Sequence, residues 1–403
     1  MTNQTRPADS YSPLYFLASL GAGGLTVTFF MYLMFWVPHP GRPVPIFGDV
    51  LTGFNSGALP MQIAIIAAVT GIAGFAFLNV KTLLWNLAAL SRFKHTTAYQ
   101  TLRNSNGETT LLAAPLAMAM TVNAMFIVGL VFVPGLWNIV EYLFPAAMVA
   151  FLAIGIWALR LIGDFLGRVL TQGGVFDVTA HNSFAQLLPA FALAMTGVGL
   201  AAPAAMSNTP LTVGIAMTLS TFFGIASVIY TVVAAITAFN SMLHHGTARE
   251  AGPTLMVVVP IMTVLGILFL RQDHALHATY GVHGSAGETM VFLARLLTVQ
   301  IVFLMLGMLV LRRQGYFNDF VLGPKTSPGS YALVCPGVAL SVMLQFFINS
   351  GLAKAGVIEK FSPAYWGLTA IAIAAQLLMI WLVLRLNKQH FARRTTAQPV
   401  PAE

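Results

Sequence analysis

Histidine is the reactive residue type that is most concentrated in one part of this chain. His274, His277 and His283 fall within ten residues, next to Asp273, between two long apolar runs. Imidazole and carboxylate groups together can bind a transition metal, but this spacing matches no strong zinc pattern. An enzyme or sensor that uses the segment as an external loop of a membrane protein is an alternative that the sequence leaves open.

The remaining candidates form no catalytic constellation. His181, His244 and His245 stand beside no nucleophile in an interpretable motif, and neither a Gly-x-Ser-x-Gly elbow nor a catalytic carboxylate pair is recognisable. Cys335 is the only cysteine, which excludes an intrachain disulfide and a cysteine-rich metal site. The sequence therefore predicts a protein that is not an enzyme and that needs no cofactor or metal.

The composition is that of a membrane protein. Hydrophobic residues make up 57% of the 403 positions and charged residues only 8%, whereas a soluble domain carries about 25% charged residues. A surface with so little charge must be covered mostly by lipid. The net charge of +8 accompanies no nucleic-acid-binding module, so we expect the basic residues to meet the membrane surface and no nucleic acid to be a partner.

Ten runs are long and apolar enough to span a bilayer, which takes about 20 residues each. The predicted fold class is therefore an all-α integral membrane protein with ten transmembrane helices. The first run is too long for the hydrophobic region of a signal peptide, about 7–15 residues, and is predicted to be a retained helix. The predicted spans are 13–37, 59–80, 110–133, 142–163, 183–203, 209–240, 253–270, 289–311, 331–350 and 363–386.

Basic residues indicate the orientation of these spans. Fifteen of the 20 lysines and arginines fall on the side that holds both termini, and five, among them Arg271 and Arg295, fall on the other side. The positive-inside rule then places both termini in the cytoplasm of a multi-pass inner-membrane protein. The predicted domains are a cytoplasmic tail (1–12), one ten-helix membrane domain (13–387) and a disordered cytoplasmic tail (388–403).

Prolines recur at a nearly constant interval. Four of them are separated by 74, 71 and 76 residues, and each interval holds two apolar runs with the proline in the first. Such a period predicts a helical hairpin repeated along the chain. A proline inside a helix removes a backbone hydrogen bond and bends the helix, so we expect the odd-numbered helices to be kinked. The four prolines are Pro115, Pro189, Pro260 and Pro336.

The first odd-numbered span has a glycine run instead of this proline. Gly21, Gly23 and Gly24 lie within it. Freed backbone groups are tolerated in a bilayer only beside protein or water, so we expect the odd-numbered helices to face inward and the even-numbered helices to face lipid. Five such hairpins with pseudo-fivefold symmetry would enclose a pore lined by Gly23, Gly24 and the four prolines. Simple close packing of helices is the alternative for the glycines.

The ionisable residues favour passive conduction. Coupled transporters usually carry buried ionisable groups near the midplane, and the middle parts of the odd-numbered spans are nearly free of them. Arg160 and Asp164 are one helical turn apart in the fourth span, so we expect them to form a local ion pair.

Short motifs in three odd-numbered spans resemble a known family. Leu112-Ala113-Ala114-Pro115, the run from Pro253 to Pro260, and Ser330 to Pro336 resemble the third, seventh and ninth helices of the tellurite-resistance/dicarboxylate transporter family and of the related slow-type anion channels of plant guard cells. The resemblance covers about 13–387. It implies passive conduction of small anions along a pseudo-fivefold axis, in a homotrimer of independent pores in the lipid bilayer.

The resemblance also implies a gate. Members of this family close the pore with a phenylalanine just before the ninth-helix proline, where this chain has Cys335. Either the pore is open at rest, or another residue such as Phe191 or Phe346 closes it. Cys335 could also pack as a small apolar residue. The alternative within transport is a proton-coupled transporter or exporter of dicarboxylate, sulfite or tellurite-like anions.

Overall fold

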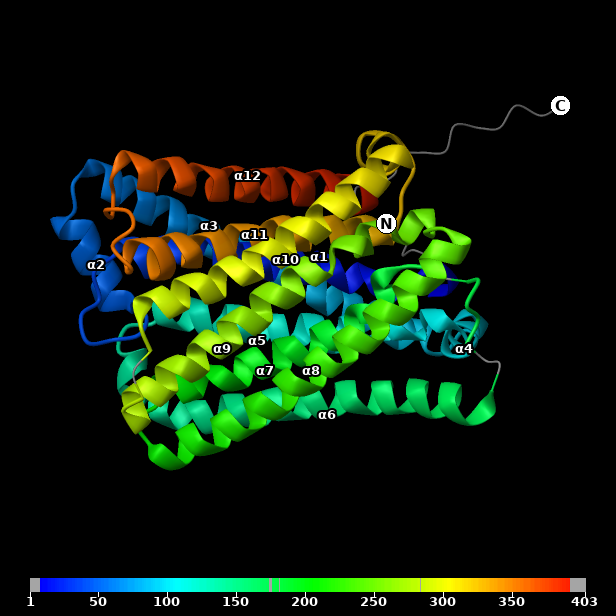
Figure 1. The fold of residues 1–403 in the computed structure, drawn as a ribbon, viewed down its shortest axis with the longest axis horizontal. Helices are drawn as coiled ribbons and strands as arrows, with labels where there is room; N and C mark the ends of the chain where they lie inside the picture. Colours follow the sequence, from blue (N-terminus) through cyan, green and yellow to red (C-terminus); the bar gives the residue numbers. More distant parts are fainter. Residues whose placement is uncertain (1–7, 174–175, 181, 283, 392–403) are drawn as a thin grey trace, which may run out of the picture.

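A computed structural model describes residues 8–173, 176–180, 182–282 and 284–391. It shows a bundle of long helices (Figure 1), and no β-strand occurs in these ranges. Among the described residues, ten helical segments are long and apolar enough to cross a membrane. The predicted all-α class and the ten predicted spans are therefore confirmed, and the chain has the features of a multi-pass membrane protein.

The odd-numbered spans share one construction, in which a short 3₁₀ segment leads into an α-helix, directly in four spans and after the single residue Val257 in the seventh. In the ninth span a π-helical stretch, η9 (Phe347–Ala353), follows the α-helix. The five pairs are η2 (Pro13–Tyr15) with α1 (Phe16–Trp36), η3 (Asn106–Leu112) with α5 (Ala113–Phe132), η5 (Phe184–Leu187) with α7 (Leu188–Met206), η6 (Arg249–Met256) with α9 (Val258–Tyr280), and η8 (Pro328–Leu333) with α11 (Val334–Phe346).

The even-numbered spans are dominated by long α-helices. They are α3 (Leu59–Phe93), α6 (Val140–Gln172, preceded by η4, Leu136–Ile139), α8 (Pro210–His245), α10 (Ala286–Arg313) and α12 (Pro363–Phe391). The remaining short elements are η1 (Ala8–Ser10), α2 (Phe47–Ser56), α4 (Thr97–Arg103) and the π-helical turn η7 (Phe317–Leu322).

The membrane domain extends slightly beyond the predicted limits. Helix α12 continues to Phe391, so residues 388–391 are helical and do not belong to a disordered tail. Near the other end, Tyr11 is buried. The hydroxyl of Tyr15 lies 3.2 Å from Nδ1 of His390, which places the start of the first span beside the end of the last. Of the two predicted tails, 1–7 and 392–403 lie outside the described residues.

The helices of the five odd-numbered spans contact one another in a closed ring. These helices, called the odd-numbered helices below, are α1, α5, α7, α9 and α11. Helix α1 contacts α5, and the contacts continue through α7, α9 and α11 back to α1. The long helix of each even-numbered span, called an even-numbered helix below, lies against two neighbours in this ring. The contacts are α3 with α1 and α5, α6 with α5 and α7, α8 with α7 and α9, α10 with α9 and α11, and α12 with α11 and α1.

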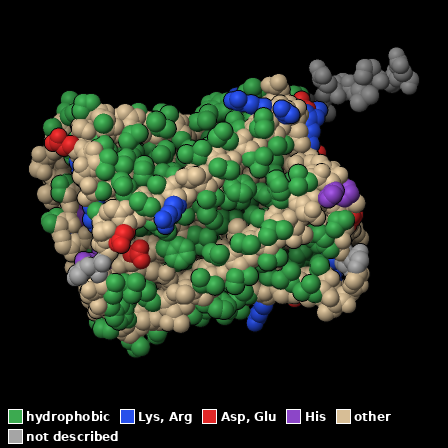
Figure 2. Space-filling model, viewed as in Figure 1, with side chains coloured by type: hydrophobic (Ala, Val, Ile, Leu, Met, Phe, Trp, Pro, Cys, Tyr) green, Lys and Arg blue, Asp and Glu red, His purple; other side chains and the backbone are tan. Residues whose placement is uncertain are grey.

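Burial follows the same division. Over the most apolar 18 residues of each span, 67% to 94% of the residues are buried in the odd-numbered spans, against 22% to 33% in the even-numbered ones. Figure 2 shows one side of the bundle, on which hydrophobic side chains dominate and charged ones are sparse. The prediction that the odd-numbered helices lie inside is confirmed.

The four recurring prolines lie at the junction between the 3₁₀ segment and the α-helix. Pro189 is the second residue of α7, and Pro115, Pro260 and Pro336 are each the third residue of their helix. The first N–H groups of an α-helix have no partner within it, so a proline fits there at little cost. This corrects the expected kink: each proline lies in the first turn of an α-helix and does not interrupt one.

Serine side chains fix the start of four of the five 3₁₀ segments. In each case the serine Oγ accepts a hydrogen bond from the backbone N–H two residues later, at 3.2–3.3 Å, which satisfies a donor that the helix leaves free. The segment η6 begins at Arg249, and Ala248, in the N-cap position before it, provides no such side-chain cap. The pairs are Ser12 with Leu14, Ser105 with Gly107, Ser183 with Ala185 and Ser327 with Gly329.

Candidate functional site: a cavity inside the helical ring

A cavity of about 840 Å³ lies among the five odd-numbered helices. Each of these helices contributes to its wall, through Leu20 of α1, Met120 of α5, Phe191 of α7, Pro260 of α9 and Cys335 of α11. The ring of helices therefore encloses space and is not packed solidly along its whole length.

Along the direction of the helices, the cavity occupies one end of the ring, away from the 3₁₀ segments. Its lining in the described chain begins within the α-helices and includes no residue of the five 3₁₀ segments, whereas Pro43 and Val44, in the loop after α1, line it at the opposite end. Toward the 3₁₀ segments the same spans are packed by buried apolar side chains, among them Leu17, Leu116 and Leu333. The end of the cavity next to the 3₁₀ segments, called its inner end below, is thus closed by a packed layer.

The predicted lining residues separate into two groups. Gly24 and Pro260 line the cavity, together with the candidate gate residues Cys335, Phe191 and Phe346. The other four predicted lining residues are buried and stand outside the lining: Gly23, Pro115, Pro189 and Pro336.

Gly23 has a packing role. A Cβ atom at this position would lie 2.8 Å from Cγ of Met120 and 2.9 Å from Nδ2 of Asn79. Asn79 donates hydrogen bonds to the backbone oxygen and to Oγ of Ser19, at 2.8 and 3.0 Å. For Gly23, therefore, the alternative of close helix packing describes the structure.

The candidate gate residues lie at opposite ends of the cavity. Phe191 and Cys335 are in the first turns of α7 and α11, at the closed end, and their exposed fractions are 3% and 8%. Phe346 is the last residue of α11, and its ring lies edge-on to that of Phe35, with 5.3 Å between the centroids. Of the two phenylalanines, only Phe191 is next to the packed layer.

Neutral polar groups line the middle of the cavity. Thr263 donates a hydrogen bond to the backbone oxygen of Ala339 at 3.0 Å and accepts one from Nε2 of Gln300 at 2.6 Å. The amide of Asn123 donates to the oxygen of Ala119 at 3.1 Å. Thr263 and Asn123 are neutral side chains, so this part of the wall carries no charge, in line with the scarcity of ionisable residues in the middle parts of the odd-numbered spans.

The part of the cavity near the end of α9 and the start of α10, called its outer part below, is charged. The prediction from sequence covered ionisable groups only in the middle parts of the odd-numbered spans and did not anticipate this charge. Arg271 of α9 lines it, and its Nη1 donates a hydrogen bond to the backbone oxygen of Val198 at 2.7 Å. The sequence places Arg271 on the external side but gives no sign that it faces the cavity, because orientation around a helix depends on its neighbours. The other ionisable residues of the lining are Lys354, Asp273, Glu288, His274 and His277.

The histidines do not form the external loop that the sequence suggested. His274 and His277 are part of α9, and His283 lies outside the described residues. Within the described ranges, no group of three histidine, cysteine, aspartate or glutamate side chains is arranged to hold a metal ion. The structure therefore gives the metal-binding alternative no additional observation.

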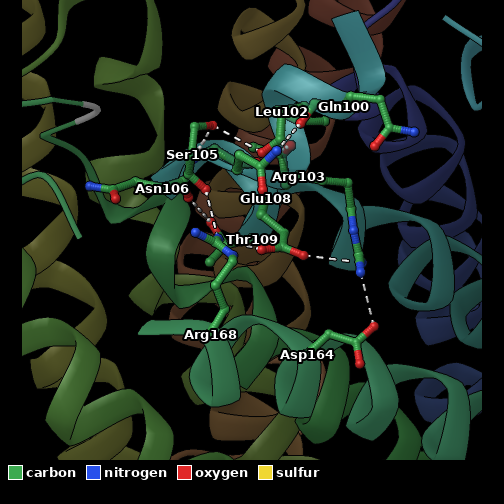
Figure 3. Close-up of polar contacts among 12 residues, drawn as sticks. Gln100, Leu102, Arg103, Ser105, Asn106, Glu108, Thr109, Asp164 and Arg168 are labelled. Carbon is green, nitrogen blue, oxygen red and sulfur yellow. Dashed lines mark hydrogen bonds and ion pairs between the residues drawn. The ribbon is translucent and has the colours of Figure 1, made fainter. Parts of the chain in front are cut away.

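A buried carboxylate ties the start of the third span to the fourth (Figure 3). Glu108 accepts from Nη2 of Arg168 at 2.5 Å and lies 3.0 Å from Nη1 of Arg103. Arg103 also contacts Asp164 at 3.1 Å, so the predicted Arg160–Asp164 pair is wrong. Burial lowers the pKa of Arg103, but the hydrogen bond with Asp164 and the negative charge of Glu108 outweigh it, and the net shift is upward.

No protein-family model matches the chain, and no curated protein matches it. The resemblance to the tellurite-resistance/dicarboxylate transporter family stays a prediction, and what the cavity can do follows from its own residues.

Proposed function

We propose that the protein is a passive channel for small anions, which cross the membrane through the cavity inside the helical ring. The observation that carries the proposal is the cavity of about 840 Å³ to which all five odd-numbered helices contribute. The even-numbered helices separate this cavity from lipid. A wetted passage spares an ion the large cost of entering hydrocarbon.

The contacts among helices support a pore along a pseudo-fivefold axis. The odd-numbered helices touch in sequence order around a ring, and every even-numbered helix lies outside two of them. The recurrence of a 3₁₀ segment before each odd-numbered helix supports five copies of one hairpin. From the family resemblance we also propose a homotrimer. From the distribution of the basic residues we propose that it lies in the inner membrane with both termini in the cytoplasm.

The charges favour conduction over coupling to protons. An arginine keeps its proton in proteins, so Arg271 can attract an anion but cannot relay protons. The middle of the cavity carries Thr263 and Asn123, which are neutral. Weak attraction without a tight site allows an ion to leave again, as conduction requires.

A proton-coupled transporter of dicarboxylate, sulfite or tellurite-like anions is the second candidate. One observation favours it: Asp273, His274, His277 and Glu288 line the outer part of the cavity, and all four are titratable. They lie near the end of α9 and the start of α10, away from the middle where coupled carriers usually hold such groups.

The proposed resting state is closed at the inner end. Phe191 and Cys335 lie there against the packed apolar layer. In the related family a phenylalanine occupies the position of Cys335, and Phe191 is the aromatic side chain that this chain offers in the same region. We propose that movement of Phe191 opens the passage.

Flux through reconstituted protein tests the proposal. Liposomes that contain the purified protein and a potassium salt, diluted into salt-free buffer with valinomycin, are expected to release chloride or nitrate faster than empty liposomes and without a pH gradient. A requirement for a pH gradient would favour the coupled transporter. No release above empty liposomes, from wild type and from the Phe191→Ala variant alike, would refute conduction.

A further inference from the structure

Arg271 is a charged residue in the cavity wall that has no counter-charge. One hydrogen bond joins its Nη1 to the backbone oxygen of Val198, at 2.7 Å. None of the ion pairs among the described residues includes it. A guanidinium group carries five N–H donors, so the contact with Val198 leaves most of them available to the cavity.

The guanidinium group of Arg271 lies far from the end of the neighbouring helix α7, although no ion pair compensates its charge. Val198 lies eight residues before Met206, the last residue of α7, which at the α-helical rise corresponds to about 12 Å along the helix. Removing a charge from bulk water is costly unless a partner compensates it. A backbone carbonyl supplies only a partial negative charge, and an anion in the cavity would supply a full one.

The acidic residues of the same lining do not fill this role. Glu288 accepts a hydrogen bond from the backbone N–H of Ser285 at 2.8 Å and caps the start of α10. Asp273 follows Arg271 by two residues on the same helix, and side chains two positions apart on a helix do not face each other. Neither carboxylate forms an ion pair with Arg271 in the described chain.

The walls around Arg271 strengthen its attraction for an anion. Val264 and Ile267, on the same helix, and Phe126 of α5 also line the cavity. A charge beside apolar walls acts in a medium of lower dielectric constant than bulk water, so its field reaches an ion with less screening. The planar guanidinium fork matches two oxygens of a carboxylate or of an inorganic oxyanion.

We propose that Arg271 is the anion-binding and selectivity site of the outer cavity, and that it holds one small oxyanion, organic or inorganic, through its guanidinium group. The inference rests on the proposed function, because the bound anion is the ion that the passage conducts. A single charge beside one carbonyl binds weakly enough to release the ion inward or outward.

Charge-removing variants with a matched control test this site. In liposomes with a gradient of potassium nitrate or potassium acetate, Arg271→Gln is expected to lower the ratio of anion to potassium permeability by about tenfold or more. Arg295→Gln removes the same charge from the exposed face of α10 and is expected to leave the ratio unchanged. An unchanged ratio in Arg271→Gln, or an equal fall in Arg295→Gln, overturns the proposal.

A second variant covers the case in which Arg271→Gln does not fold. Arg271→Lys keeps the charge but loses the planar fork, so it is expected to retain anion selectivity while its preference for acetate or nitrate over chloride falls. If Arg271→Lys keeps the wild-type preference among these anions, the guanidinium group does not select oxyanions over chloride and the proposal fails.

Direct binding separates failure of the site from failure of the channel. Acetate and nitrate are titrated into detergent-purified wild type and Arg271→Lys, with thermal stabilisation as the measure of binding. Stabilisation that weakens in Arg271→Lys, from protein that conducts nothing, supports the site and refutes the channel. Flux from wild type with equal stabilisation of both proteins supports the channel and refutes the site.

Discussion

Gly24 of α1 lies directly against Val338 of α11: a Cβ atom on the glycine would stand 2.7 Å from Cγ1 of the valine. One turn away, a Cβ on Gly21 would stand 2.8 Å from Cγ1 of Val334. These two contacts join the first and the last odd-numbered helices, so they close the ring. A side chain at either glycine would push α1 and α11 apart at the cavity.

Gly24→Ala is expected to destabilise the protein, because the added methyl group cannot fit against Val338. Overpacking of this kind costs about 1–3 kcal/mol, and a lower thermal midpoint in detergent would measure it. Gly74→Ala in α3 is the matched control, since a Cβ atom added there would meet no atom within 4 Å. That control is expected to be neutral or slightly stabilising; equal destabilisation by both changes would contradict the packing role of Gly24.

Glu108→Gln is expected to lower stability strongly, because it leaves Arg168 without its carboxylate. The two side chains are 3% and 14% exposed, and breaking a buried ion pair costs about 3–5 kcal/mol. Asp164→Asn removes the outer member of the same network, whose side chain is 57% exposed, and is expected to cost about 0–1 kcal/mol. Denaturant titration of both variants measures the difference, and equal losses would show that burial of Glu108 is unimportant.

Stability is expected to fall in acid partly through Asp319. A hydrogen bond from Lys325, followed by the positive charges of Lys325 and Arg249, holds the pKa of Asp319 below its ordinary value of 3.8. A carboxylate whose folded pKa is depressed stabilises the fold above its unfolded pKa and loses this contribution as the pH falls through the folded value. The difference in thermal midpoint between wild type and Asp319→Asn should therefore shrink from about pH 6 to about pH 3. A difference that stays constant over this range would exclude the linkage.

Cys335→Phe is expected to reduce anion flux in liposomes, because a bulky ring at the closed end of the cavity adds to the packed layer. A small anionic thiol reagent added at the outer mouth is expected to have the same effect on wild type. Cys335 is the only cysteine, so Cys335→Ser provides a thiol-free control that the reagent should leave unaffected. Full flux after both the substitution and the reagent would remove Cys335 from the conduction path.

Phe191→Ala is expected to increase flux while it lowers stability. Loss of a buried phenylalanine costs about 3–5 kcal/mol, and the same loss opens space at the inner end of the cavity. Phe346→Ala makes an equal change at the outer end and is expected to leave flux near the wild-type level. Flux and melting are measured on the same preparations. Reduced flux in Phe191→Ala, or equal increases in both variants, would rule out Phe191 as the gate.

The sequence predicted the ten spans because length and hydropathy are properties of a local stretch of chain. The differences are at the ends, where α12 continues to Phe391 beyond the predicted limit at 386. The inward position of the odd-numbered helices was also predictable, since prolines and glycines in lipid need protein or water beside them. The 3₁₀ segments before these helices were not anticipated, so the prolines were assigned to kinks.

The residues around the cavity depended on packing between distant parts of the chain. Gly23 and Gly24 are adjacent in sequence, yet Gly23 packs against Met120 and Asn79 while Gly24 lines the cavity. Arg271 could be assigned to the external side by charge counting. Its contact with Val198, 73 residues earlier, shows that the side chain points toward the inside of the ring. Composition and periodicity determine that a segment forms an apolar helix long enough to span a membrane. Which of its faces meets the cavity is decided by the helices that surround it, because that choice minimises unfilled space and unpaired charge for all of them together.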